Sequence, residues 1–160
     1  VVLTTGGRTE QFAMKERAEL PPACFVQMGD FLRYALDEAV AQGLRQVVIG
    51  GMVGKLTKIA QGETITHANR AEVDTQLLAD LAASLGAPPA DCAAIAAAET
   101  ARFAAERMEA LGLSAPFHTA LARAVVRTLM APARYGGQFQ LHVLVCDFDG
   151  RKVAEAFSHD

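Results

Sequence analysis

Residue types that mark several protein classes are scarce in this sequence of 160 residues. Tryptophan is absent, and the three cysteines, Cys24, Cys92 and Cys146, lie far apart. The sequence has no Cys-x-x-Cys pair and no Cys/His cluster, which argues against a disulfide scaffold and a structural zinc site. We therefore expect no protein-bound metal and a reducing, cytoplasmic location.

Long apolar runs and an excess of positive charge are missing as well. No run approaches the roughly 20 apolar residues of a membrane span, and the alanine-rich stretch 90–105 is interrupted by Asp91, Glu99 and Arg102. The net charge is −3, so no basic surface is expected to follow a phosphate backbone. Membrane and nucleic-acid partners are therefore not expected. No signal peptide is recognisable, and the start inside an apolar run without methionine suggests that upstream residues are missing.

Hydrophobic residues make up 51% of the chain and charged residues 21%, which is enough to form the core of one ordinary domain. Three short apolar runs, residues 1–5, 23–28 and 44–50, are each followed by glycine and then by a helical stretch. This alternation is typical of βαβ units with a mostly parallel sheet flanked by helices. We therefore predict an α/β fold, with residues 1–160 as a single domain.

The C-terminal part returns to strand character. Residues 138–147 alternate in polarity, and Asp149-Gly150 is a hairpin signal, so residues 152–157 are expected to pair antiparallel at an edge. The sequence therefore predicts that a C-terminal antiparallel edge hairpin completes the sheet.

Helix signals lie between the strands. Asp30 can cap a helix that Gly43 closes. A second helix is expected over residues 70–85, with Asn69 and Glu72 at the spacing of a capping box.

Two further helical stretches are expected before the C-terminal strands. An alanine-rich helical region is expected to run to Leu111. A long helix is expected to start after Ser114 and Pro116 and to end near Pro132.

Ligands of open α/β sheets bind beyond the carboxyl ends of the strands. Three loops qualify: Gly6-Gly7, Gly29-Asp30 and Gly50-Gly51. Glycine there lets backbone approach a ligand closely. The third loop opens the richest stretch, residues 50–67, which we call the glycine-lysine segment.

This segment does not fit the known phosphate-binding loops. A Walker A loop needs four residues between its first glycine and Gly-Lys, followed directly by Ser or Thr. Here three residues separate Gly50 from Gly54, and Leu56 follows Lys55, which displaces the hydroxyl to Thr57. The dinucleotide pattern GxGxxG is absent too, so a nucleotide site is disfavoured.

The two lysines of the segment allow two interpretations. Lys55 and Lys58 could form the solvated face of a short amphipathic helix, with Leu56 and Ile59 facing inward. They could instead bind an anion, because both follow a glycine turn at a sheet edge, near a helix N-terminus.

The segment ends in Thr66-His67, just before Asn69. A histidine in a loop beside a lysine-bearing helix could donate a hydrogen bond to an anion or move a proton. The other histidines, His118, His142 and His159, have no recognisable partner and are interpreted as structural or incidental. No GxSxG nucleophile motif occurs.

These residues together resemble the cobalt-precorrin-5B C1-methyltransferase family of anaerobic cobalamin biosynthesis. The family pattern runs approximately G-H-x-G-K-L-x-K-x-A-x-G, then a short spacer and T-H-S. Residues 50–62 with Thr66-His67 resemble it, and residues 27–32 resemble the preceding strand and loop. The likeness covers most of residues 1–85. We interpret two positions as departures from the pattern, Gly51 in place of histidine and Ala68 in place of serine.

The resemblance implies methyl transfer from S-adenosylmethionine to C1 of a cobalt tetrapyrrole, with the cobalt belonging to the substrate. It implies Lys55, Lys58 and Arg70 as anchors for substrate carboxylates, and Thr66 and His67 as catalytic residues. From their position in the loops that follow the predicted strands, Gly6, Gly7, Gly50, Gly51 and Gly54 are the glycines expected to bind this cofactor.

The family's N-terminal half, with its own Gly/Thr-rich motif, is absent. The chain therefore resembles the C-terminal domain of a two-domain protein, whose partner would be that N-terminal domain or a second copy. Two alternatives stay open: a noncatalytic domain that binds a tetrapyrrole or other polycarboxylate, and a phosphate- or nucleotide-binding enzyme.

Overall fold

The computed structural model describes residues 1–67 and 72–160. In chain order the elements are β1 (Val2–Thr4), α1 (Gly7–Glu16), the 3-10 turn η1 (Pro22–Cys24), β2 (Phe25–Gln27), α2 (Leu32–Ala41), β3 (Gln46–Gly51), α3 (Val53–Ala60), α4 (Thr75–Ser84), α5 (Pro89–Ala96), α6 (Ala101–Ala110), α7 (Ser114–Leu129), β4 (Gln140–Cys146) and β5 (Lys152–Phe157). Strands and helices alternate up to α3, as the apolar runs predict.

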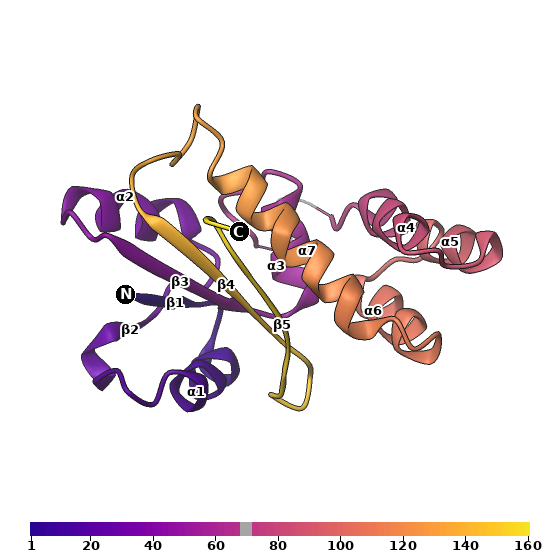
Figure 1. Ribbon diagram of the computed structural model, residues 1–160, viewed down its shortest axis with the longest axis horizontal. Helices are drawn as coiled ribbons and strands as arrows, with labels where there is room; N and C mark the ends of the chain where they lie inside the picture. Colours follow the sequence, from indigo (N-terminus) through magenta and orange to yellow (C-terminus); the bar gives the residue numbers. More distant parts are fainter. Residues whose placement is uncertain (68–71) are drawn as a thin grey trace.

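The strands form one five-stranded sheet in the order β2-β1-β3-β4-β5 (Figure 1). The first four strands are parallel, and β5 pairs antiparallel with β4 at the edge. The turn between them is held by the Asp147 carboxylate, which accepts hydrogen bonds from the backbone of Asp149 and Arg151. The predicted α/β fold with a C-terminal antiparallel edge hairpin is therefore confirmed.

Side-chain alternation along the strands divides the core between the two faces of the sheet. On one face Leu3, Ile49 and Val143 join the larger hydrophobic cluster, to which α2, α3 and α7 contribute. On the other face Val48 packs with Phe12 of α1 in a smaller cluster. Figure 1 shows α1 apart from α2, α3 and α7. The sheet is therefore covered more heavily on the face that carries three helices.

Helices α4, α5 and α6 form a lobe beyond α3 and α7, at the right of Figure 1. Leu78, Ile95 and Met108, one from each helix, are fully buried in the same cluster as Phe117 of α7. The core therefore continues without a break from the sheet into this lobe. No helix within the described residues is long and apolar enough to cross a membrane.

One helix start differs from the prediction. The helix expected over residues 70–85 begins at Thr75, because the Asp74 carboxylate accepts a hydrogen bond from Leu77 N at 3.1 Å and caps it. Glu72 precedes the helix, so the expected capping box does not start it. Asn69 itself lies outside the described residues.

The alanine-rich region is two helices rather than one. The irregular stretch after α5 ends at Thr100. Its hydroxyl accepts a hydrogen bond from Phe103 N and so caps the start of α6. The next helix, α7, begins at Ser114 instead of after Pro116. Proline is tolerated there because the amides of a first helical turn have no partner within the helix.

Candidate functional site

Three loops meet at the carboxyl edge of the sheet. Thr4 of β1 is in register with Gln27 of β2 on one side and with Gly50 of β3 on the other. The loops that follow these strands are therefore neighbours, as the sequence predicts. The chain runs from β1 outward to β2 and then back across to β3, and such a reversal of strand order creates a ligand crevice in open α/β sheets.

Helix α3 carries the glycine-lysine segment away from this edge. Val53, Leu56 and Ile59 recur at helical spacing and are buried in the core. Thr57 is also fully buried, and its hydroxyl donates to Val53 O at 2.7 Å. This hydroxyl is not available to a magnesium ion, which removes the last element of the Walker A interpretation.

Asp30 contacts Lys55 and Thr66, and Lys58 contacts Thr66; we call these four residues the cluster. Its carboxylate forms an ion pair with Lys55 and accepts a hydrogen bond from the Thr66 hydroxyl at 3.2 Å. The hydrogen bond from Lys55 is the main cause that holds the Asp30 pKa below its ordinary value. The predicted capping role of Asp30 is wrong, because α2 begins after Phe31 without a side-chain cap.

Thr66 ties the end of the glycine-lysine segment to this ion pair. Its backbone N–H donates to Asp30 O at 3.0 Å, and its carbonyl accepts from Lys55 at 3.2 Å and Lys58 at 3.3 Å. The side chain is only 2% exposed. Thr66, predicted as catalytic, therefore holds the loop over α3, and its hydroxyl points to Asp30.

Lys58 is buried, so the interpretation of both lysines as a solvated face is wrong for this residue. It is 7% exposed, and its ammonium group donates to the Thr66 carbonyl. Among residues 1–67 and 72–160, no carboxylate forms an ion pair with it. The single carboxylate of the cluster, Asp30, is bound by Lys55. The cluster therefore carries a buried positive charge without a matching anion, which is energetically costly.

A cavity of about 370 Å³ lies against these residues. Gly54, Lys55 and Lys58 form one wall, at the start of α3. Val53 of α3 also lines it, and the remaining lining residues come from neighbouring loops and α6: Met52, Val73, Glu99, Thr100, Ala101, Arg102 and Phe148. Most of the lining area is apolar, and the cavity opens to solvent.

The remaining side chains predicted to bind or react are placed differently. His67 is exposed, and its charge contributes to lowering the Asp30 pKa, so it lies near the cluster. Arg70 and Ala68 lie outside the described residues, and the predicted anchoring role of Arg70 stays a prediction.

The first predicted glycine loop belongs to the opposite face. Gly6 precedes α1, and its backbone N–H donates to the Thr9 hydroxyl at 3.0 Å. Gly7 is the first residue of α1. Neither glycine lines the cavity beside Lys58. Their predicted contact with a cofactor stays a prediction.

Gly50 and Gly51 are strand residues, so the expected turn at these positions is wrong. β3 runs through Gly51, and both glycines are buried. A Cβ at Gly51 would approach Leu56 Cδ2 to 2.9 Å. Counted back from Gly54-Lys55, the histidine of the family pattern falls on Met52, so the departure assigned to Gly51 belongs there. Gly51 matches the glycine of the pattern, and packing explains it.

The other potentially reactive side chains described here, a cysteine and two histidines, are buried or hydrogen-bonded within the fold. Burial raises the pKa of the Cys146 thiol to about 11, which disfavours a thiolate nucleophile. The His118 ring lies 2.8 Å from Ser114 O and is almost completely buried. His142 contacts Glu155 at 2.9 Å, a partner that the sequence did not reveal.

The structure thus defines an open α/β domain with a cationic, mainly apolar cavity at the carboxyl edge of its sheet. The family model described as CbiD, C-terminal domain, matches residues 65–157. Over half of the chain is matched, so this chain belongs to the CbiD family.

Three relatives of this chain carry the name cobalt-precorrin-5B C(1)-methyltransferase. The protein of Paracidovorax citrulli (strain AAC00-1) is 84% identical over 158 residues, which are 99% of this chain and 42% of the relative. The protein of Polaromonas sp. (strain JS666 / ATCC BAA-500) is 72% identical over 98% of this chain and 41% of its own length. The protein of Salinispora tropica is 44% identical, and the match covers 96% of this chain and 40% of the relative.

The chain therefore spans about two fifths of the length of these relatives. No solved structure matches it.

Proposed function

We propose that this chain is the C-terminal part of a methyltransferase that adds a methyl group to C1 of a cobalt-precorrin. The name of the relatives supports the reaction and the substrate. The observation in the structure that best supports a ligand site is the buried ammonium group of Lys58, which lines an apolar cavity at the carboxyl edge of the sheet.

Lys58 supplies the binding energy for an anionic group in this proposal. Two ammonium groups, Lys55 and Lys58, donate to the same carbonyl, while one carboxylate, Asp30, neutralises only the first. A ligand carboxylate that enters the cavity would pair with an ammonium group on a side chain that is itself almost completely buried. Charge-assisted hydrogen bonds are strongest in such surroundings. The carboxylate side chains of a cobalt tetrapyrrole have the required charge.

S-adenosylmethionine is the proposed cofactor, and it supplies an electrophilic methyl group on a sulfonium when bound. The cavity offers apolar walls for such a molecule at Val73 and Phe148. At Gly54 a Cβ would meet nothing within 4 Å, so backbone there is open to close approach.

The remaining residues of the cluster position the site. Methyl transfer to carbon requires in-line alignment more than a protein nucleophile, so rigid binding groups contribute most of the rate. Lys55 and Thr66 hold the loop over α3 through Asp30, which fixes Lys58 against the cavity. His67 is exposed beside this cluster and is proposed to donate to an anionic substrate group or to move a proton.

Two alternative functions predict different ligands. A noncatalytic tetrapyrrole-binding domain would use Lys58 in the same way but would bind no S-adenosyl ligand. A nucleotide-binding enzyme would bind ATP, which the burial of Thr57 disfavours.

Titration calorimetry distinguishes these functions. The protein is this chain extended at its N-terminus by the upstream part of the Paracidovorax citrulli relative, called here the extended chain. S-adenosylhomocysteine, ATP and a cobalt tetrapyrrole are titrated separately. We expect S-adenosylhomocysteine and the tetrapyrrole to bind. Lys58→Met should weaken at least one of them by about tenfold, the loss of one charge-assisted contact.

Lys15→Met is the matched control, because it removes an exposed lysine from α1. It should leave both affinities unchanged. Binding of the tetrapyrrole without S-adenosylhomocysteine would favour the noncatalytic domain and overturn the methyltransferase. ATP binding in place of both would favour the nucleotide enzyme.

A further inference from the structure

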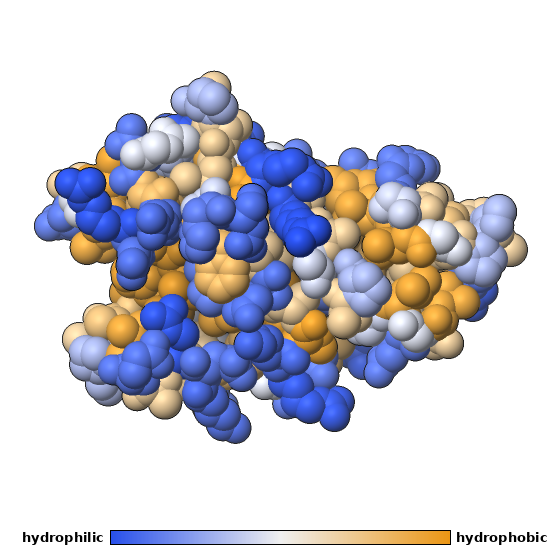
Figure 2. Space-filling view, in the orientation of Figure 1, coloured by the Kyte–Doolittle hydropathy of each residue, from blue (hydrophilic) through white to orange (hydrophobic). Residues whose placement is uncertain are grey.

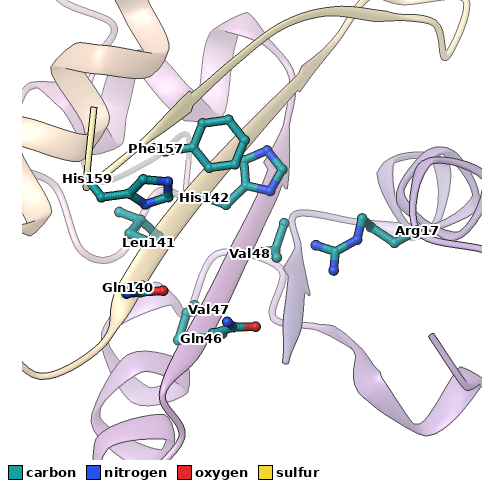
Figure 3. A pocket seen from close by; sticks show the side chains of 9 residues that line it. All are labelled: Arg17, Gln46, Val47, Val48, Gln140, Leu141, His142, Phe157 and His159. Carbon is teal, nitrogen blue, oxygen red and sulfur yellow. The ribbon is translucent and has the colours of Figure 1, made fainter. Parts of the chain in front are cut away.

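Among the described helices, none covers part of the sheet on the α1 side. α1 packs chiefly on β1, β2 and β3, and beyond it His142 and Phe157, with the buried Val48 at the border towards α1, face a pocket of about 320 Å³ (Figure 3). Gln46 and Gln140 form its border at the amino end of β3 and β4. We call these five residues the open face. Mostly parallel sheets are normally covered on both faces, so this surface is an exception within the fold.

Side chains on the open face are already ordered. The His142 and Phe157 rings stack with centroids 4.1 Å apart and planes 15° from parallel. Glu155 contacts His142 Nε2 at 2.9 Å and fixes the ring. Figure 3 shows Arg17 reaching from beyond the end of α1 towards Val48 on the far side of the pocket. A preformed aromatic surface loses little conformational entropy when a partner covers it.

The backbone at the start of the chain leads directly to this surface. Val1 N donates to Gln46 O at 3.0 Å, and Val1 O accepts from Val48 N at 2.9 Å. The hydrogen-bonded ladder with β3 therefore extends to the first residue. A residue upstream would continue beside β3, and strand alternation would direct its side chain to the face that Val2 occupies. Val2 packs on the α1 side, so this is the side of the open face.

We propose that the open face is the docking surface for the polypeptide that precedes Val1 in a protein of the relatives' length. The relatives contain more than half of their length outside the matched region, and the family model that matches is that of a C-terminal domain. The upstream polypeptide emerges beside Gln46, at the border of the open face, and it covers Phe157 and His142. This inference does not depend on methyl transfer.

Hydroxyl-radical footprinting of the 160-residue chain and of the extended chain tests this proposal. The oxidation rate of Phe157 should fall several-fold in the extended chain. Phe103 is the internal control, because it is a phenylalanine on α6, 38% exposed, away from the open face. Its oxidation rate should be the same in both proteins.

A pair of variants separates docking from indirect effects. Phe157→Asp in the extended chain should restore oxidation of His142 and speed proteolysis just upstream of Val1. Phe103→Asp should do neither. Circular dichroism of each variant verifies that the sheet is retained, and a second variant, Gln140→Arg, places a charge on the open face without removing the aromatic stack.

Three results would overturn the proposal. Equal oxidation of Phe157 in the two proteins would show that the upstream polypeptide lies elsewhere. Protection that grows with concentration in the 160-residue chain, together with a dimer in sedimentation, would assign the face to a second copy. Unchanged proteolysis of both Phe157→Asp and Gln140→Arg would show that the face does not hold the upstream part. None of these results bears on the ligand affinities that test the proposed function.

Discussion

The ammonium group of Lys58 is confined more tightly than any other charge described in the glycine-lysine segment. It is 7% exposed, donates to a backbone carbonyl and faces an apolar cavity. Lys55, three residues earlier, has 33% of its side chain exposed and is neutralised by Asp30. Two lysines that look alike in the sequence therefore have different surroundings: Lys55 is paired with Asp30, whereas Lys58 is buried against the cavity and is the one proposed to bind a ligand.

Gly51 and Gly54 provide a residue-scale test of packing. Gly51→Ala should lower the free energy of unfolding by about 1–3 kcal/mol, because the new Cβ collides with Leu56 in a filled core. Gly54→Ala should raise it by about 0.5–1 kcal/mol, since the site is helical and the space is open. Urea denaturation measures both. Equal destabilisation by the two substitutions would contradict the packing explanation of Gly51.

The Asp30 carboxylate gives a pH-dependent signature. Its pKa is lowered in the folded chain, mainly by the hydrogen bond from Lys55. The ion pair therefore stabilises the fold at pH values above the unfolded pKa of about 3.9, and the contribution is lost as pH falls through the lower folded pKa. Asp30→Asn should flatten the loss of stability below pH 4, measured by urea denaturation at several pH values. A profile as steep as that of the unsubstituted chain would contradict this assignment.

Sequence reasoning finds part of the site at this scale and misses part. Lys55, Lys58 and Thr66 stand out because their spacing follows a known pattern. The role of Asp30 does not, because its contact with Lys55 spans 25 residues and depends on β1 lying between β2 and β3. The signal that the sequence offers is the position of Asp30 in a glycine-containing loop at the carboxyl end of a strand. The cavity walls from α6 and Phe148 carry no signal at all.

At the scale of elements, the alternation of apolar runs with helices predicts the strands well. The predicted and observed hairpin strand, Lys152–Phe157, coincide. Helix boundaries are less predictable, because several residues compete to cap the same helix. Asn69-Glu72 has the better capping pattern, yet Asp74 caps α4. The Gln61 side chain helps to decide this, since it binds Glu72 O and Asp74 N and holds the chain extended there.

The cap of α4 gives the element-scale prediction. Asp74→Ala should lower the free energy of unfolding by about 1 kcal/mol, because Leu77 N loses its partner. Asp74→Ser should recover most of this loss, since serine is also a good N-cap. Asp80→Ala, which removes an exposed carboxylate of the same helix, is the control and should have a smaller effect. Thermal denaturation measures the order of stability of the three variants. An equal loss of stability in all three would show that Asp74 is not the cap.

At the scale of the whole molecule, the Lys58 cavity and the open face lie at different places on the sheet. The carboxyl edge holds the Lys58 cavity, while the open face lies towards the amino ends of β3 and β4, beside Val1. Figure 2 shows hydrophobic residues gathered in a hollow at the end of the molecule that carries the N-terminus in Figure 1. The α4–α6 lobe at the other end closes one wall of the cavity through α6. The parallel direction of β3 and β4 places the two surfaces at opposite ends of these strands.

The most direct test of the account is a methyl-transfer assay with the extended chain. S-adenosylmethionine with a 13C-labelled methyl group is incubated with cobalt-precorrin-5B, and the product is examined by NMR. We predict a labelled methyl on C1 of the tetrapyrrole, and a kcat/KM about tenfold lower for Lys58→Met but unchanged for Lys15→Met. Absence of the labelled product, or full activity of Lys58→Met, would contradict the proposed role of the Lys58 cavity.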